Sequence, residues 1–463
     1  MSLPVLLRPR SDHALPERLA ASAAVVGAGA DIATADVDAW LAERAAAHRF
    51  TVERVPLDAM DLWSSAPDTG NIGHRSGRFF TVEGLSVTVD EGPFRHWQQP
   101  IIRQPEIGIL GLLATEIDGV LHFLLQAKME PGNRNLLQLS PTVQATRSNY
   151  TGVHRGGFVR HLEHFTRPEL GAVIHVDVLQ SEHGAWFHRK FNRNVLVETT
   201  APVRAGGDFR WFTLGQIGEL LRRDNVVNMD TRTIVACLPV APGGDSALGT
   251  DAELTSWFTV ERARRDIEVA RIPLAEVAGW ERGQHAIHRT DDRYFHVVAV
   301  RVEAGSREVA SWSQPLFEPQ GTGIVAFLTR LIGGEPHLLV QAKAEAGFLG
   351  GVELGPTVQS VPANWADVPA EARPPFLDAV LAAPPTRIRY AAVHSEEGGR
   401  FLHAESRYLF VDVDDEQAPL DPPAGFRWAT PGQLTALTRH GQHVNVQART
   451  LLACLNAGAV RLA

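Results

Sequence analysis

Leu124-Leu125-Gln126-Ala127-Lys128-Met129-Glu130, followed by Leu139-Ser140-Pro141-Thr142-Val143-Gln144, decides the fold because it occurs twice in the chain. The second occurrence, 215 residues later, is Leu339-Val340-Gln341-Ala342-Lys343-Ala344-Glu345 followed by Leu354-Gly355-Pro356-Thr357-Val358-Gln359. Trp97-Gln98-Gln99-Pro100 matches Trp312-Ser313-Gln314-Pro315 at the same offset. A repeating unit of about 200 residues has the size of a domain and is far longer than a solenoid repeat. The sequence therefore predicts two tandem copies of one globular domain.

The two copies divide the chain into a lead-in, a first copy, a linker and a second copy. Residues 1–35 are expected to be a loosely ordered N-terminal lead-in, and residues 36–239 form the first copy. Residues 240–252 contain the Pro- and Gly-rich linker, and residues 253–463 form the second copy.

Each copy reads as a helix, a series of short strands and a closing helix, which predicts an α+β fold. The expected helices cover residues 37–47, 214–222, 254–265 and 431–439, the last with Thr430 as its N-cap and proline in first position. The expected strands of the first copy cover residues 79–89, 122–128, 137–146, 173–179 and 186–191.

Bulk composition excludes several classes of protein. The net charge is −9 and no basic run is present, which argues against nucleic-acid binding. No segment has the length of apolar sequence that a membrane span needs, and no signal peptide is apparent. The two cysteines, Cys237 and Cys454, lie at matched places inside apolar runs, so we expect buried free thiols and a cytoplasmic protein.

A polar face on one predicted hairpin is the candidate binding site. Because side chains alternate along a strand, Phe123, Leu125 and Ala127 point to one face and the polar residues to the other. The loop 131–135 suits an antiparallel hairpin, whose polar face would carry Gln126, Lys128, Glu130, Gln138, Ser140, Thr142 and Gln144.

The alternative is that this is an ordinary solvent-facing side of a sheet. Against it, the second copy keeps Gln341, Lys343, Glu345, Thr357 and Gln359, and the chain has only three lysines, Lys128, Lys190 and Lys343. Amides, hydroxyls, an amine and a carboxylate together suit a hydroxyl-rich ligand such as a sugar. Further candidates for contact with the ligand are Trp97, Trp312, Arg103, Asn133, Asn135, Arg147, Ser148, Asn149, Tyr150 and His154.

Tryptophan at position 97 or 312 could equally be a core residue. Three further arginines, Arg134, Arg189 and Arg193, are possible partners for phosphate but are more often solvated surface residues.

These residues resemble the NDP-hexose 2,3-dehydratases over about residues 36–455. The matching motifs are residues 97–102, 108–111, 126–133, 138–146, 148–151, 225–229 and 232–233. The resemblance implies a tandem of Nudix-like domains, a homodimer, and no metal or redox cofactor. It also implies a dTDP-linked 4-keto-6-deoxyhexose as substrate, in deoxysugar biosynthesis for a secondary metabolite such as an antibiotic.

The reaction that this resemblance implies needs a base for the C3 proton, a donor facing the enolate oxygen and an acid for the C2 hydroxyl. Lys128 is the candidate donor, Glu130 or His154 the candidate base, and Tyr150 the candidate acid. The unstable diketo product would then pass to a separate NADPH-dependent 3-ketoreductase.

The copies differ in ways that place the working site on the first. Asn133, Asn135 and Ser140 are replaced by Phe348, Gly350 and Gly355. The second copy is therefore expected to hold a degenerate nucleotide site, with Trp312, Gln341, Lys343, Glu345, Thr357 and Gln359.

Two alternative functions fit the sequence less well. A Nudix-type nucleoside diphosphate hydrolase would hold Mg²⁺ with a glutamate-rich helix, and the sequence has no such run. A non-catalytic nucleotide-sugar binding protein fits the second copy better than the first, which keeps more groups that can transfer protons.

Overall fold

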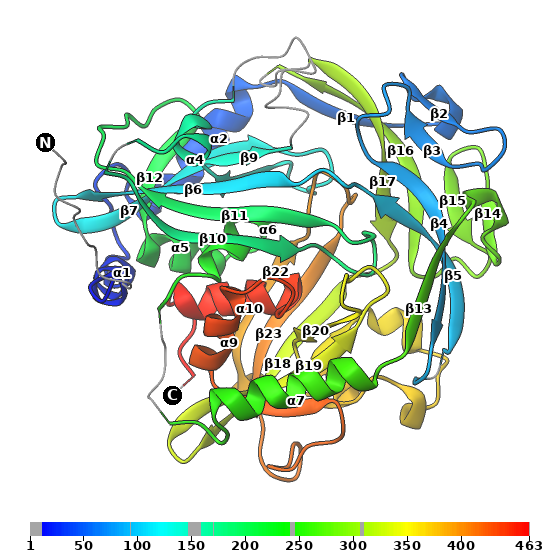
Figure 1. The fold of residues 1–463 in the computed structure, drawn as a ribbon. Coiled ribbons are helices and arrows are strands. Elements are labelled where there is room, and N and C mark those ends of the chain that lie inside the picture. The colour runs from blue at the N-terminus through cyan, green and yellow to red at the C-terminus, as the bar shows by residue number, and fades with distance from the viewer. Residues whose placement is uncertain are drawn as a thin grey trace, which may run out of the picture.

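The computed structural model describes residues 12–92, 94–146, 159–169, 171–240, 246–305 and 310–462. Each copy contributes one large mixed sheet and one smaller antiparallel sheet (Figure 1). In the part of the chain that is described, no helix is both long and apolar enough to cross a membrane. The α+β class predicted from the sequence is confirmed.

The large sheets have matching strand orders. The first is ordered β10-β11-β6-β7-β12, with β8 on β7 and β9 on β6. Its strands are β6 Gly108–Ile117, β7 Val120–Met129, β8 Leu137–Pro141, β9 Val143–Ala145, β10 Val173–Ser181, β11 Phe191–Glu198 and β12 Phe209–Thr213. The second has β18 Gly323–Ile332, β19 Glu335–Ala344, β20 Val352–Gly355, β21 Val358–Ser360, β22 Ile388–Ser395, β23 Glu405–Asp412 and β24 Phe426–Ala429. Each contains one parallel pair, β6 with β11 and β18 with β23.

The small sheets exchange a strand between the copies. In the first, β13 (Ile267–Ile272) of the second copy pairs with β4 of the first copy, and in the other, β1 (Phe50–Val55) of the first copy pairs with β16 of the second. The remaining strands are β2 Trp63–Ser65, β3 Ile72–His74, β4 Thr81–Val89, β5 His96–Arg103, β14 Trp280–Arg282, β15 Ala286–Arg289, β16 Phe295–Ala304 and β17 Ser311–Pro319. The two copies are therefore interlocked by the exchanged strands.

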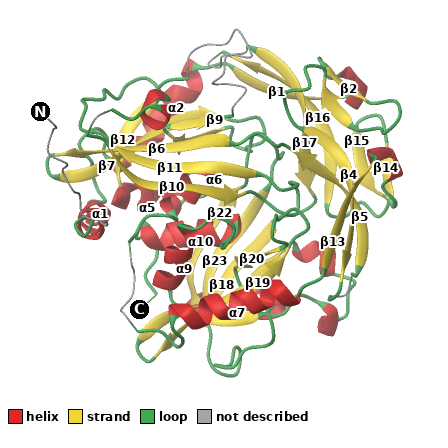
Figure 2. Ribbon diagram, in the orientation of Figure 1, coloured by secondary structure: helices red, strands yellow, loops and turns green. Residues whose placement is uncertain are grey.

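The helices lie at the edges of the large sheets and between them (Figure 2). They are α1 Leu15–Ala24, α2 Val37–Ala47, α4 Glu163–Thr166, α5 Leu214–Leu221, α6 Met229–Val235, α7 Asp251–Arg264, α8 Leu377–Leu381, α9 Pro431–Thr438 and α10 Val446–Asn456. Short 3₁₀ turns cover Thr34–Asp36, Leu57–Ala59, Leu274–Glu276, Pro362–Trp365, Ala370–Ala372 and Pro385–Arg387.

Two buried arginines connect the copies through α6 and α10. Arg232 of α6 donates to the carbonyl oxygens of Val227 and Ser395, each at 2.6 Å. Arg449 of α10 makes the equivalent bonds to Val444 and Ser181, also at 2.6 Å. Both side chains are 0% exposed, so each guanidinium replaces its lost hydration with bonds to both copies.

Most expected elements are present, with three differences. The hairpin is confirmed, because Lys128 pairs with Gln138 and Gln126 with Ser140. Residues 186–190 form a loop and not a strand, because Lys190 and the chain before it are held by contacts to other loops. The lead-in contains α1, whose Ser22 hydroxyl donates to the Leu121 carbonyl oxygen and whose apolar side packs on the core. The helices α6 and α10 were not expected, because every residue of both is buried and neither has the solvent-exposed polar face that marks a surface helix in the sequence.

Candidate active site

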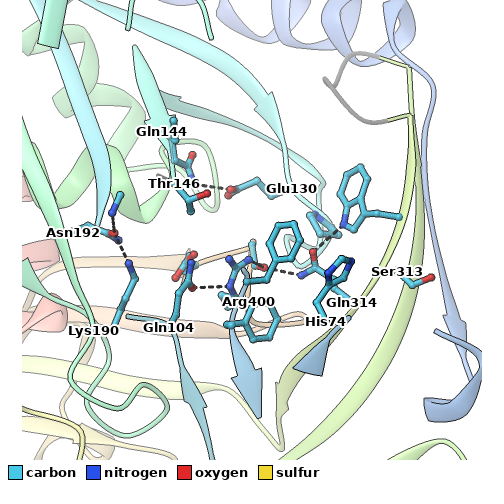
Figure 3. Close-up of a pocket in the computed structure, with 18 of the residues that line it drawn as sticks. His74, Gln104, Glu130, Gln144, Thr146, Lys190, Asn192, Ser313, Gln314 and Arg400 are labelled. Atoms are coloured by element: carbon cyan, nitrogen blue, oxygen red, sulfur yellow. Dashed lines mark hydrogen bonds between the residues drawn. The ribbon is translucent and has the colours of Figure 1, made fainter. Parts of the chain in front are cut away.

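A cavity of about 320 Å³ lies between the first copy's large sheet and elements of the second copy. Its size falls in the usual range for small-molecule sites, about 300–1,000 Å³. The polar lining from the first copy comprises Asp61, His74, Gln104, Lys128, Glu130, Gln144, Thr146, Lys190, Asn192 and Asp230. Of these, Figure 3 labels His74, Gln104, Glu130, Gln144, Thr146, Lys190 and Asn192. The second copy contributes Ser311, Trp312, Ser313, Gln314, Glu397, Gly399 and Arg400.

Three of the predicted residues form one hydrogen-bonded group in this cavity. Glu130, at the end of β7, is 4% exposed and accepts a bond from the side-chain amide of Gln144 at 2.7 Å. The Lys128 ammonium donates to the Gln144 carbonyl oxygen at 3.2 Å. Gln144 contacts both residues because the pairing of β8 with β7 ends at Pro141, after which the chain pairs with β6 as β9. An amine and a carboxylate are thereby presented side by side.

A second polar group surrounds Lys190. Its ammonium donates to the Glu106 and Phe191 carbonyl oxygens and to the Asn192 side-chain oxygen, the last at 2.8 Å. Asn192 in turn donates to Glu182 at 2.6 Å. Burial lowers the pKa of Lys190 to about 8, since the neutral amine is the form that a low-dielectric site favours.

The second copy reaches this cavity through a close backbone contact at Gly132. The Gly132 amide donates to the Gly398 carbonyl oxygen at 2.8 Å, and a Cβ at position 132 would lie 1.7 Å from the Phe401 carbonyl oxygen. Only glycine allows this approach. It brings the loop 397–400 over the cavity, where Arg400 donates to the side-chain oxygen of Gln104 at 3.0 Å.

Trp312 enters the cavity on β17 of the second copy. Its indole nitrogen donates to the Gln314 side-chain oxygen at 2.9 Å, and Gln314 donates to the Gly399 carbonyl oxygen at 2.8 Å. The tryptophan, the glutamine and the loop carrying Arg400 thus form one wall, which the second copy provides.

Comparison with known proteins places this arrangement in a family. The sequence profile of the NDP-hexose 2,3-dehydratases matches residues 34–238 and again residues 251–455. The chain belongs to the NDP-hexose 2,3-dehydratase family.

Three relatives carry the same name, dTDP-4-dehydro-6-deoxy-alpha-D-glucopyranose 2,3-dehydratase. The relative from Amycolatopsis orientalis is 56% identical over 460 residues, covering 98% of this chain and 97% of its own. The relative from Streptomyces violaceoruber is 52% identical, covering 91% and 97%. The relative from Saccharopolyspora spinosa is 46% identical, covering 92% of each chain.

In this dehydratase-family chain, Trp97 and Arg103 lie away from Lys128. Trp97 is on β5, in the small sheet that packs against Ala346 of the second copy. Arg103 is an exposed partner of Glu83, with 3.9 Å between nitrogen and oxygen. The tryptophan that lines the cavity with Lys128 is Trp312 and not its counterpart Trp97, because β17 of the second copy contributes to this cavity while Trp97 on β5 packs near Ala346.

Several other predicted residues brace the hairpin and do not line the cavity. Gln138 accepts from the Ser395 hydroxyl at 2.8 Å, and the Ser140 hydroxyl accepts from Asn228 at 2.8 Å. The Thr142 hydroxyl accepts from the Leu113 amide at 2.8 Å. Asn133 lies 3.5 Å from Glu130, Asn135 donates to the Asn225 carbonyl oxygen at 2.8 Å, and Gln126 lies on β7 opposite Ser140.

Other candidates occupy the surface or fall outside the described ranges. Arg134 pairs with Glu405 and Arg193 with Asp177, both on the exterior, and Arg189 lies by Phe348 of the second copy. Five predicted site residues lie outside the described part of the chain: Arg147, Ser148, Asn149, Tyr150 and His154.

The second copy repeats the hydrogen-bonded group of the first. Gln359 donates to Glu345 at 2.8 Å, Lys343 to the Gln359 carbonyl oxygen at 3.5 Å, and the Thr357 hydroxyl accepts from Leu328. Gln341 lies on β19 opposite Gly355. Burial raises the pKa of Glu345 and lowers that of Lys343. Trp312 does not belong to this group, since it lines the first copy's cavity.

Besides Asp61, four charged residues of the cavity were not predicted: Lys190, Asp230, Glu397 and Arg400. A signal for them was present, because at the matched positions the other copy carries Ala404, Gln447, His183 and Trp186. The prediction relied on polar residues that both copies share, and many of these support the fold in both copies. The charged residues that line the cavity differ between the copies, so differences between the copies are the better indicator of the cavity.

One cluster of titratable side chains lies elsewhere. His161, Glu163 and His164, at α4, place their potential ligand atoms within 4.8 Å of one another. His164 bonds to Glu169 at 3.4 Å and His161 lies edge-on to Phe209. These contacts account for the position of the two rings, and none of the three residues lines the cavity.

Proposed function

We propose that the protein removes water across C2 and C3 of dTDP-4-keto-6-deoxyglucose, giving the 3,4-diketo-2,6-dideoxy sugar in deoxysugar biosynthesis. The observation that carries this proposal is the cavity in which Lys128 and Glu130 lie side by side, in a chain 56% identical to a relative named for this reaction. The activity is that of a hydro-lyase.

The chemistry follows from the C4 ketone, which acidifies the proton on C3. Glu130 is placed to accept that proton, because its carboxylate is held by Gln144 at the cavity wall. Lys128 faces the negative charge that develops on the C4 oxygen, and an ammonium in a site that excludes water stabilises such a charge strongly. The C2–O bond then breaks, and the resulting enol gains a proton at C2 and becomes the diketone. His154 as base and Tyr150 as acid remain predictions from the sequence.

The reaction transfers no electrons out of the sugar, so no redox cofactor is required. The product is oxidised at both C3 and C4, and a separate NADPH-dependent 3-ketoreductase is the partner that would consume it. In the wall from the second copy, Trp312 offers a face for the thymine base and Arg400 a cation for the diphosphate.

Incubation with dTDP-4-keto-6-deoxyglucose, with and without a chelator, tests the proposal. We expect loss of one water from the sugar nucleotide by mass spectrometry, at the same rate with chelator. Release of dTMP that stops with chelator would instead identify a Nudix-type hydrolase. Tight binding without conversion would identify a non-catalytic binding protein.

We further propose that each copy is Nudix-like, that the protein is a cytoplasmic homodimer, and that the second copy retains a degenerate nucleotide site. The mixed sheets with one parallel pair support the first point. Light scattering tests the dimer, and calorimetric titration with dTDP, giving one or two sites per chain, tests the retained nucleotide site.

A further inference from the structure

Asp230 is a buried carboxyl group that opens onto the cavity. It is 3% exposed, and among the described residues no hydrogen bond reaches its side chain. Burial raises the pKa of Asp230 well above its ordinary value, and the negative charges of Glu397, Glu130 and Glu182 raise it further, while Lys128 opposes them. The raised pKa favours the protonated carboxyl group, which is the form that can donate a proton.

The backbone around Asp230 is held rigidly. It is the second residue of α6, whose N-cap Asn228 accepts from the Thr231 amide at 2.9 Å and donates to the Ser140 hydroxyl at 2.8 Å. Arg232, two residues later, is fixed to both copies. The carboxyl group is therefore aimed into the cavity by a scaffold that spans the whole molecule.

The second copy gives an internal comparison. It keeps the scaffold as Asn445 and Arg449 but carries Gln447 at the position of Asp230. Glu397, whose pKa burial raises to about 7, corresponds to His183. The positions matching Asp230 and Glu397 thus carry no carboxyl group, although the fold around them is the same.

We propose that Asp230 donates the proton to the departing C2 hydroxyl group. This inference rests on the proposed dehydration. As the enolate electrons form the C2–C3 double bond, the C2–O bond breaks, the Asp230 O–H bond breaks and the leaving oxygen departs as water. Asp230 becomes a carboxylate and regains a proton when the enol hydroxyl at C3 becomes the ketone, while C2 receives the proton that Glu130 took from C3. Glu397, from the second copy, acts as a positioning residue, because its negative charge raises the pKa of Asp230.

Asp230→Asn separates this role from a structural one. We expect dehydration to fall about 10²- to 10⁴-fold, the usual effect of losing a general acid. In deuterium oxide the variant should still exchange the C3 proton, since Glu130 and Lys128 remain. With the 2-deoxy-2-fluoro analogue of the substrate, fluoride release should stay near the wild-type rate, because fluoride leaves without protonation.

A second variant controls for misfolding, and a pH profile tests the ionisation of Asp230 separately. Asp230→Gln introduces the residue that the second copy carries at this helical position, so the fold should tolerate it. This variant should also dehydrate the sugar slowly while keeping C3 proton exchange and fluoride release. Asp230 must be protonated to act, so activity falls as pH rises through its pKa. Glu397→Gln removes a negative charge, lowers that pKa and should move the falling limb to lower pH.

The outcomes separate the two proposals. If the wild-type protein releases neither water nor fluoride from these sugars, the proposed function fails. If the wild type does so and a folded Asp230 variant dehydrates normally, or loses C3 exchange and fluoride release as well, only the role of Asp230 fails. Tyr150→Phe showing the predicted pattern, with Asp230→Asn normal, would assign the acid to Tyr150. If the fall in activity at high pH occurs at the same pH in Glu397→Gln as in the wild type, the inference is contradicted.

Discussion

Glu353→Gln should change how the stability of the protein depends on pH. Glu353 lies on β20, is 1% exposed, and accepts a bond from the Ser181 hydroxyl at 2.6 Å. Burial raises its pKa from the ordinary 4.5 to about 7. The first copy has Gln138 at this position, accepting from Ser395 in the same way, so the substitution fits the fold.

The magnitude follows from proton linkage. Between pH 4.5 and 7 the folded protein holds a proton on Glu353 that the unfolded chain has released, so rising pH destabilises the native state. At about 1.4 kcal/mol for each pH unit, this group alone removes about 3 kcal/mol. The glutamine variant cannot lose a proton. Its free energy of unfolding, relative to wild type, should therefore increase by about 2–3 kcal/mol from pH 4.5 to pH 8.

Urea unfolding followed by tryptophan fluorescence at both pH values measures this difference. Comparing the two pH values cancels any constant cost of the new amide. Glu268→Gln, at an exposed position on β13, is the matched control and should show no such change. A relative change below about 1 kcal/mol, or one of opposite sign, would refute the assignment of a raised pKa to Glu353.

Three further substitutions test the site and the connection between the copies. Arg449→Met should lower the free energy of unfolding by about 3 kcal/mol or more, because it removes short bonds to the Val444 and Ser181 carbonyl oxygens and the Thr233 hydroxyl, whereas exposed Arg222→Met should have little effect in the same urea assay. Glu130→Gln should lower kcat about 100-fold or more, and Glu345→Gln, in the matching group of the second copy, should lower it far less; equal losses would contradict a working site on the first copy. Trp312→Ala should raise KM more than Trp97→Ala, because Trp312 lines the cavity and Trp97 does not, and steady-state kinetics with the dTDP-linked substrate decides this.

The sequence predicted the hairpin well, because alternation along a strand is a local property. Lys128 and Gln138 are cross-strand neighbours as expected. It did not predict which tryptophan faces Lys128, because the exchange of β1 and β13 depends on long-range strand pairing that no local pattern encodes. The sequence did not predict Asp230 as a site residue for a similar reason. Asp230 follows a short buried connection, and the packing of α6 brings it near Glu130 and Glu397.

The exchanged strands make each copy depend on the other for a complete small sheet. Deletion of the C-terminal copy would remove β13 from the small sheet of the N-terminal copy and leave one edge of β4 unpaired. It would also remove Trp312 and Arg400 from the cavity wall. The second copy is therefore required for the structure of the first, whatever its own pocket binds, and the chain cannot be shortened to one copy without losing part of the cavity wall.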